Sequence, residues 1–212
     1  MDASFLPAAL AAHAPVLGVV VPLFMAAVLV AVPNGRFAWG VVLASTVFAL
    51  FIAFELVAQT RLSGVVSYQL GGWAPPHGIE FRIDELNSVI VLLIGAMGVL
   101  SAIFALPSVA DEISPGKRGL FYAAFLVCFS GLNGVALTGD AFNLFVFLEI
   151  SSLGTYALVA MGHQNDRQAL TASFNYLVMG TIGATFFVIG VGFLYMATGT
   201  LNMADIARIV VD

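Results

Sequence analysis

The amino-acid sequence predicts an all-α integral membrane protein with six transmembrane helices and a short β-hairpin between the second and third helices. Two observations on composition and one on length predict this class. Hydrophobic residues make up 61% of the 212 residues and charged residues only 9%. Soluble domains carry about a quarter charged residues, so an ordinary soluble surface cannot be formed. Several apolar segments also reach the roughly 20 residues that a helix needs to cross a bilayer.

Six segments qualify as spanning helices within a single membrane domain, 1–212. Their approximate limits are 14–32, 37–57, 85–108, 118–138, 141–161 and 169–198. Each must be helical because lipid offers no partner for backbone amide and carbonyl groups. Turn-forming or charged residues separate these segments, at 33–36, 107–118 and 162–167. The connection at 138–140 is so short that the fourth and fifth helices are expected to be antiparallel neighbours.

The longest connection predicts a β-hairpin at the membrane surface. Residues 66–70 and 79–83 alternate between apolar and polar side chains, which is the period of a strand. In the second stretch, Glu80 belongs to the polar set. Turn-forming residues occupy 71–78 between the two stretches. We therefore expect a hairpin over 64–84 on the extracytoplasmic side.

Two aspartates mark the starts of helices, and the chain closes with a short amphipathic segment. Asp84 and Asp140 each precede an apolar run, where a carboxylate can accept hydrogen bonds from the free amides of the first helical turn. Residues 201–211 are too short and too polar to span a bilayer. They predict an amphipathic helix lying at the interface.

Charge and cysteine content exclude several classes of function. The net charge is −5 and no basic cluster is present, which argues against binding to nucleic acid. The single cysteine, Cys128, cannot form an internal disulfide and offers no metal-ligand spacing. His13, His77 and His163 are scattered, and we expect each at the surface. With no paired membrane histidines, cysteine cluster or glycine-rich loop, we expect no cofactor and no redox catalysis by the chain itself.

The basic residues predict an orientation. Connections between helices one and two, three and four, and five and six carry Arg36, Lys117, Arg118 and Arg167. On the other side, Arg61 and Arg82 lie in the longer hairpin connection. By the positive-inside rule, the N-terminus is expected outside the cell and the protein in the plasma membrane.

Glu149 is the residue expected to carry chemistry. It lies roughly 13 Å along the fifth helix, counted from Asp140 at about 1.5 Å per residue. That depth is close to the middle of a hydrocarbon layer about 30 Å thick, where an ionisable group is costly. We therefore interpret Glu149 as a proton-transfer residue. The alternative is a neutral acid that forms a hydrogen bond between helices.

Polar residues nearby are expected to hold water beside this carboxylate. The possible residues of such a hydrated path are Asn133, Asn143, Ser152, Tyr156 and Asn175. Ser152 and Tyr156 follow Glu149 by three and seven residues and so lie on the same side of the helix. For Asn175, a helix-to-helix hydrogen bond is the equally weighted alternative. Glu55 is expected near the outer end of the second helix, where a carboxylate costs little, and we favour a structural role for it.

Four stretches of the chain resemble one family. Residues 139–153, GDAFNLFVFLEISSL, are similar to the fifth-helix signature of antiporter-like subunits. Residues 71–79, 84–87 and 199–204 resemble the same family, which includes the D subunit of Mrp-type multisubunit Na+/H+ antiporters. It also includes the proton-pumping membrane subunits of respiratory complex I and of membrane-bound hydrogenases. The branch of the Mrp D subunit resembles the chain most.

This resemblance implies a partner for Glu149. In the family, the fifth-helix glutamate pairs with a lysine on a broken seventh helix, and their separation and approach gate proton movement. Family members have more than twice as many helices, built around inverted repeats. The single lysine of this sequence, Lys117, lies in a connection. We therefore expect either that the chain is the N-terminal piece of a longer subunit or that a separate polypeptide supplies the remainder.

Three functions follow, in order of preference. The first is a subunit of a multisubunit cation/H+ antiporter, with H+ and Na+ as the transported ions and other membrane subunits as partners. The second is a proton-pumping subunit of a redox complex, in which another subunit oxidises NADH, ferredoxin or a related donor. The third is a non-conducting structural subunit.

Overall fold

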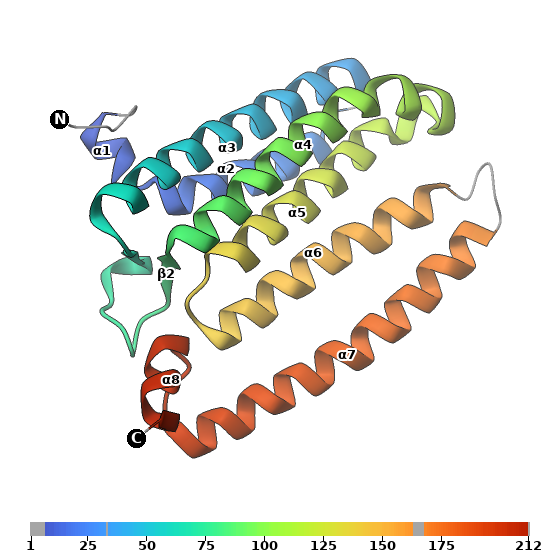
Figure 1. The fold of residues 1–212 in the computed structure, drawn as a ribbon. Helices are drawn as coiled ribbons and strands as arrows, with labels where there is room; N and C mark the ends of the chain where they lie inside the picture. The colour runs from blue at the N-terminus through green and yellow to red at the C-terminus, as the bar shows by residue number, and fades with distance from the viewer. Residues whose placement is uncertain (1–6, 33, 163–167, 212) are drawn as a thin grey trace.

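The computed structural model describes residues 7–32, 34–162 and 168–211. Within these ranges, long helices and one two-stranded hairpin make up most of the chain (Figure 1). In chain order the elements are α1 (Ala8–Ala11), α2 (Ala14–Val30), α3 (Gly35–Ser63), β1 (Val66–Gln69), η1 (Leu70–Gly72), β2 (Glu80–Ile83), α4 (Glu85–Glu112), η2 (Pro115–Lys117), α5 (Arg118–Leu137), α6 (Ala141–Met161), α7 (Gln168–Thr198) and α8 (Met203–Val211).

The all-α membrane class predicted from the sequence is confirmed. Among the described helices, five are long and apolar enough to cross a membrane, namely α3 to α7. The remaining expected span, α2, which is the first along the chain, is also apolar but has 17 residues. That length is at the lower limit of about 17–25 residues for a spanning helix. The chain is therefore a multi-pass membrane protein.

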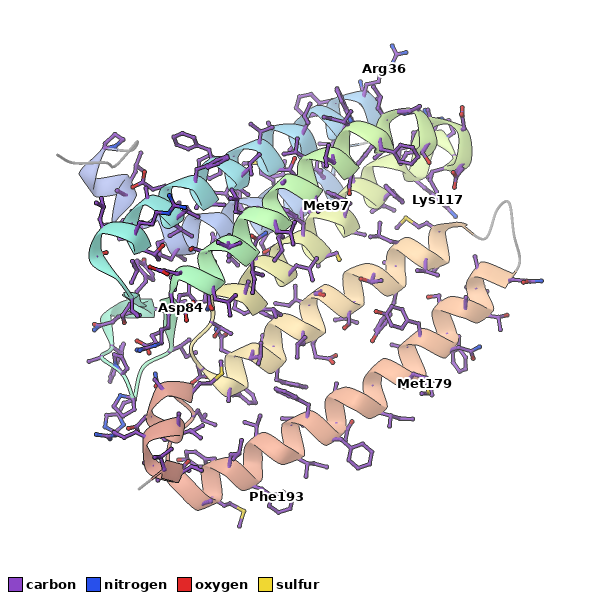
Figure 2. All side chains as sticks on the ribbon, in the orientation of Figure 1. Arg36, Asp84, Met97, Lys117, Met179 and Phe193 are labelled. Carbon is purple, nitrogen blue, oxygen red and sulfur yellow. The ribbon has the colours of Figure 1, made fainter. Side chains whose placement is uncertain are left out.

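The helices form a four-helix group with two more helices added in a row. Helices α2, α3, α4 and α5 pack on one another, α6 packs on α5, and α7 packs on α6. Two clusters of buried apolar side chains lie near the two ends of the four-helix group, and the one at the hairpin end also includes Phe81 and Ile83 of β2 and Phe147 of α6. The outward side of α7 is open: Met179 and Phe193 point away from the other helices and are 69% and 65% exposed (Figure 2).

Side-chain caps explain where three helices begin. The Asn34 carboxamide oxygen accepts hydrogen bonds from the first amides of α3. Asp84 accepts from the Asn87 amide at 2.8 Å, and Asp140 accepts from the Asn143 amide at 2.7 Å. Each bond satisfies an amide that has no partner within its own helix. The two predicted aspartate caps are confirmed.

Helix α3 corrects the expectation for Glu55. The helix continues to Ser63, six residues beyond the predicted end at 57, so Glu55 does not lie at a helix end. Its side chain is 0% exposed, and the Gln59 amide donates to its carboxylate at 2.9 Å. The same Gln59 amide also donates to the backbone carbonyl of Ala11. The added helical turns thus place Glu55 within the helix, beside a Gln59 that also contacts the end of α1, instead of leaving it at the surface.

The hairpin forms where the alternation predicts it, with one difference in which face is buried. Val66 to Gln69 pair in antiparallel register with Ile83 to Glu80. In β2 the polar Glu80 is 3% exposed, while Ile79 just before it is 40% exposed. Glu80 is buried because the α5–α6 and α7–α8 connections cover that face of the hairpin, an arrangement visible at one end of the bundle in Figure 1.

Some predicted features lie outside the described residues. These are Pro33 in the first connection and residues 163–167 in the fifth, which include His163 and Arg167. The other two histidines are exposed, as expected. His13 forms a 3.0 Å hydrogen bond with the Tyr68 hydroxyl of β1, and His77 belongs to the turn of the hairpin.

Candidate functional site

Glu149 is the ninth residue of the 21-residue helix α6. At about 1.5 Å per residue, this places its Cα close to the middle of the helix. The side chain is half-buried. Which neighbour faces it can be read from the contacts of the residues one and two turns away on α6.

One face of α6 packs tightly on α5. A Cβ added at Gly131 of α5 would lie 2.6 Å from the Ser151 amide nitrogen, so the two backbones approach closely. Small residues at such a contact are typical of helix packing in membranes. Further along, the Cys128 thiol lies 3.3 Å from the Thr155 hydroxyl. Glu149 is half a turn away from Ser151 around the helix and therefore on the side opposite α5.

The other face of α6 is turned toward α7 and includes Glu149. The Tyr156 and Tyr176 rings pack edge to face with centroids 5.1 Å apart. The Ser173 hydroxyl donates to the Tyr156 carbonyl at 2.9 Å, and the Tyr156 hydroxyl lies against Gly180. Glu149 precedes Tyr156 by two helical turns and shares this face, as does Ser152.

The surroundings of Glu149 on α7 are apolar. Helices α6 and α7 run in opposite directions (Figure 1). The part of α7 level with Glu149 therefore lies about two turns beyond Gly180, near the half-buried residues Ala184 and Phe187. Within the described ranges, no hydrogen bond or ion pair is formed by the Glu149 carboxylate.

The structure brings together only part of the expected hydrated path. Ser152 is half-buried and Tyr156 is 7% exposed, both on the face of Glu149. Asn133 is buried on the side of α5 that faces away from α6, and its amide donates to the Phe129 carbonyl of its own helix. Asn143 donates to the Thr138 hydroxyl at 2.9 Å, at the start of α6. Asn175 is exposed on the outer side of α7, half a turn from Ser173.

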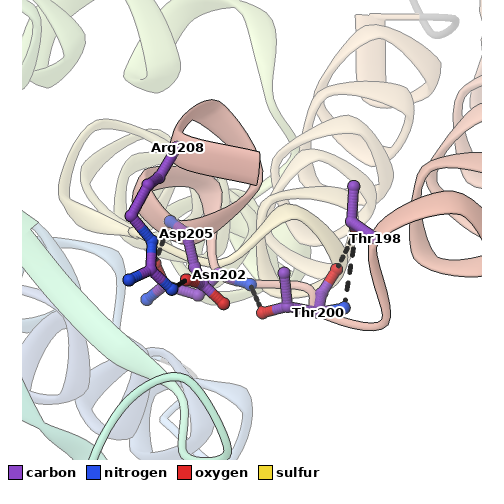
Figure 3. Close-up of polar contacts among 5 residues, drawn as sticks. All are labelled: Thr198, Thr200, Asn202, Asp205 and Arg208. Carbon is purple, nitrogen blue, oxygen red and sulfur yellow. Dashed lines mark hydrogen bonds and ion pairs between the residues drawn. The ribbon is translucent and has the colours of Figure 1, made fainter. Parts of the chain in front are cut away.

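Sequence reasoning missed a second group of polar residues, at the hairpin end of the bundle. Both carboxylate oxygens of Glu80 accept hydrogen bonds, from the Ser67 hydroxyl at 2.6 Å and from the Asn202 amide at 2.8 Å. Asn202 also caps α8 by accepting from the Asp205 amide. Figure 3 shows this turn, where Asp205 pairs with Arg208. Alternation grouped Glu80 with the polar residues of the strand and gave no sign of its burial, because strand period cannot show which connections will cover a strand.

Fold and site define a class: a multi-pass membrane protein with an acid in mid-span, on the face of one helix that is turned toward its neighbour. Residues 138–211 match the family model described as NADH:quinone oxidoreductase/Mrp antiporter, TM. This stretch begins just before α6 and includes Glu149. The chain belongs to this family of antiporter-like membrane subunits, as the resemblance of residues 139–153 indicated.

Relatives come from both branches of the family. The chain is 43% identical over 199 residues to NADH-quinone oxidoreductase subunit N of Desulforudis audaxviator, covering 92% of the chain and 39% of that protein. It is 35% identical over 164 residues to the D subunit of the Na(+)/H(+) antiporter of Bacillus subtilis, covering 77% and 32%. Similarity to the redox branch is thus at least as high as similarity to the antiporter branch.

A solved structure has the same fold. A chain of the Mrp complex from Dietzia sp. DQ12-45-1b superposes with a TM-score of 0.79 at 32% identity, over 91% of the present chain and 36% of that chain. The chain therefore spans less than two fifths of the length of this structure, and about two fifths or less of the two relatives.

Proposed function

We propose that this chain is a membrane subunit of a multisubunit monovalent cation/H+ antiporter, in which Glu149 takes and releases the transported proton. The observation that carries the proposal is the placement of Glu149: in mid-span on α6, half-buried, on the face turned toward α7. An ionisable residue at that depth is costly and is rarely kept for packing alone. Na+ is the proposed counter-ion, by analogy with the antiporter relative of Bacillus subtilis.

In this proposal, Glu149 alternates between its ionised and protonated forms as a basic partner approaches and withdraws. An opposite charge nearby favours the carboxylate, and its removal favours protonation. Ser152 and Tyr156 share the face of Glu149 and can hold water there. We expect the basic partner on a segment outside the described ranges, as in the family that the sequence resembles. We further propose that other membrane subunits are the partners of the chain, that it lies in the plasma membrane, and that its N-terminus is extracytoplasmic.

The test is transport by the assembled complex carrying Glu149→Gln. Purified complex is reconstituted in proteoliposomes, and Na+-driven pH changes are followed with a pH-sensitive dye. We expect Glu149→Gln to abolish the pH change, because a glutamine cannot release a proton. Glu85→Gln, at the exposed first turn of α4, is the matched control and should transport normally. Normal transport by an assembled Glu149→Gln complex would contradict the proposal and favour a purely structural subunit.

A second candidate function is a proton-pumping subunit of a redox complex. The 43% identity to a NADH-quinone oxidoreductase subunit favours it. The two candidates differ in the partners that purify with the chain. Hydrophilic subunits with iron–sulfur centres, together with NADH- or ferredoxin-driven proton uptake, would select the redox pump. A complex of membrane subunits that transports Na+ without an electron donor would select the antiporter.

A further inference from the structure

Glu80 is buried in contact with three separate parts of the chain, two through its carboxylate and one through its backbone carbonyl. It is 3% exposed, although it belongs to a surface hairpin. Ser67 donates to it from β1, and Asn202 donates to it from the α7–α8 connection. The backbone carbonyl of Glu80 accepts from the Gly139 amide of the α5–α6 connection at 2.9 Å. One residue therefore joins the hairpin to the connection before α6 and to the connection after α7.

The segment that leads into α6 is held from two sides. Thr138 forms a bridge with Phe81 of β2, and Asp140 forms a bridge with Asn202. The Gly139 carbonyl accepts from the Met203 amide at 2.9 Å. A Cβ at Gly139 would lie 2.9 Å from the Arg82 Cβ, so only glycine fits between the hairpin and the α7–α8 connection. The segment before α6 is thus held between the hairpin on one side and the α7–α8 connection on the other.

This arrangement acts on the helix that carries Glu149. Helix α6 starts directly after Asp140, and the Ala141 amide donates to the Leu201 carbonyl at 2.9 Å. A helix is stiff over its length, so a shift or rotation at its first residue moves Glu149, two turns further on. The α7–α8 connection, which contains Leu201, also anchors the end of α7, the helix that Glu149 faces.

We infer that Glu80 is a positioning residue for Glu149: its carboxylate holds Asn202 of the α7–α8 connection, its backbone carbonyl holds Gly139 of the α5–α6 connection, and together they fix the start of α6 and the end of α7 relative to each other. The inference rests on the proposed function of Glu149. Glu80 does not itself carry the proton. It keeps α6 and α7 in the relative position that allows a basic partner to approach Glu149 and withdraw.

Two variants of Glu80 separate the effect of its hydrogen bonds from the effect of its side-chain size. Glu80→Gln keeps an oxygen for the Asn202 amide and offers an amide to the Ser67 hydroxyl, which can also accept. Glu80→Ala removes both bonds. Asn202→Ser removes the donor to Glu80 and keeps a side chain suited to cap α8. Glu85→Ala, an exposed acid at the same end of the bundle, is the control.

The experiment measures Na+-driven H+ transport per assembled complex in proteoliposomes. We expect Glu80→Ala to lower the maximal rate about tenfold, the factor that corresponds to a lost hydrogen bond to a charged group. The half-saturating Na+ concentration should not change. Glu80→Gln should restore the rate to within about twofold. Because both changes remove the same contact, the double variant with Asn202→Ser should lose no more than Glu80→Ala alone. If Glu80→Ala does not assemble, Asn202→Ser carries the test.

Amide hydrogen exchange gives a readout that does not depend on transport. In Glu80→Ala, exchange of residues 138–144 and 199–205 should rise about tenfold, and in Glu80→Gln it should match the unmodified chain. A normal rate and normal exchange in Glu80→Ala would overturn the positioning role while leaving Glu149 as proposed. Normal transport in Glu149→Gln would instead overturn the proposed function. A loss in Glu80→Ala that Glu80→Gln does not restore would also contradict positioning by hydrogen bonds.

Discussion

The hydroxyl group of Tyr156 on α6 lies where a side chain at Gly180 on α7 would begin. A Cβ added at Gly180 would overlap the Tyr156 oxygen and would lie 3.1 Å from the ring carbon that carries it. The same tyrosine packs edge to face on Tyr176 and is 7% exposed. The contact sets the separation of the two helices on the face that contains Glu149.

Gly180→Ala is expected to push α7 away from α6 at this contact. Overpacking of a filled interface costs about 1–3 kcal/mol. We expect a lower apparent melting temperature of the purified complex and reduced transport, because Glu149 shares the disturbed face. Thermal unfolding monitored by size-exclusion chromatography, together with the proteoliposome assay, measures both effects.

Two variants show whether the Tyr156 hydroxyl is responsible. Gly183→Ala, three residues along α7 with nothing within 4 Å of an added Cβ, should behave like the unmodified protein. Tyr156→Phe combined with Gly180→Ala should recover much of the lost stability, because the overlapping oxygen is gone. Equal stability of Gly180→Ala and Gly183→Ala would show that the two helices are not held at this distance.

Glu55 is expected to support the structure without taking part in transport. Its carboxylate is fully buried and accepts a hydrogen bond from Gln59. Glu55→Gln keeps an oxygen acceptor there, so transport and stability should change little. Glu55→Ala removes the acceptor and leaves a cavity, which should destabilise the protein by about 2–5 kcal/mol. Abolished transport by a stable Glu55→Gln complex would instead give Glu55 a role in proton transfer.

The Asp140 cap is expected to be worth about 0.5–2 kcal/mol, the usual range for such residues. Asp140→Ala removes the acceptor for the Asn143 amide, whereas Asp140→Asn retains it. We therefore predict a lower apparent melting temperature for Asp140→Ala and a near-normal one for Asp140→Asn. A similar loss in both variants would mean that the negative charge, and not the hydrogen bond, stabilises the start of α6.

The sequence predicted what depends on period and composition. The six helices, the hairpin and the shared face of Glu149, Ser152 and Tyr156 all follow from spacing along one element. Helical period relates residues only within one helix. It could not show that Asn133 of α5 and Asn175 of α7 lie away from Glu149, because the face that each helix turns to its neighbour is known only once the helices are packed.

Burial of acids depends on tertiary contacts that no local pattern contains. Glu80 belonged to the polar set of its strand, yet segments near Gly139 and Asn202 cover it. Glu55 looked interfacial, yet α3 continues past it to Ser63, and Gln59 on the added turns bonds to the Ala11 carbonyl. For Glu80 the hydrogen bonds that offset the cost of burying a carboxylate come from Ser67 and from the distant Asn202, whereas Glu55 receives a bond from Gln59, one turn further along the same helix.

The orientation of the chain is open to a direct labelling test. We predict that the hairpin end of the bundle faces the outside of the cell and that the end with Lys117 faces the cytoplasm. In a Cys128→Ser background, single cysteines replace the exposed residues Gln69 in β1 and Gly116 in η2. A membrane-impermeant maleimide added to intact cells should label the cysteine at position 69 and leave the one at 116 unlabelled until the membrane is opened. The reverse pattern would invert the proposed orientation and place the Glu80 contacts on the cytoplasmic side, so that protons reaching Glu149 past the start of α6 would come from within the cell.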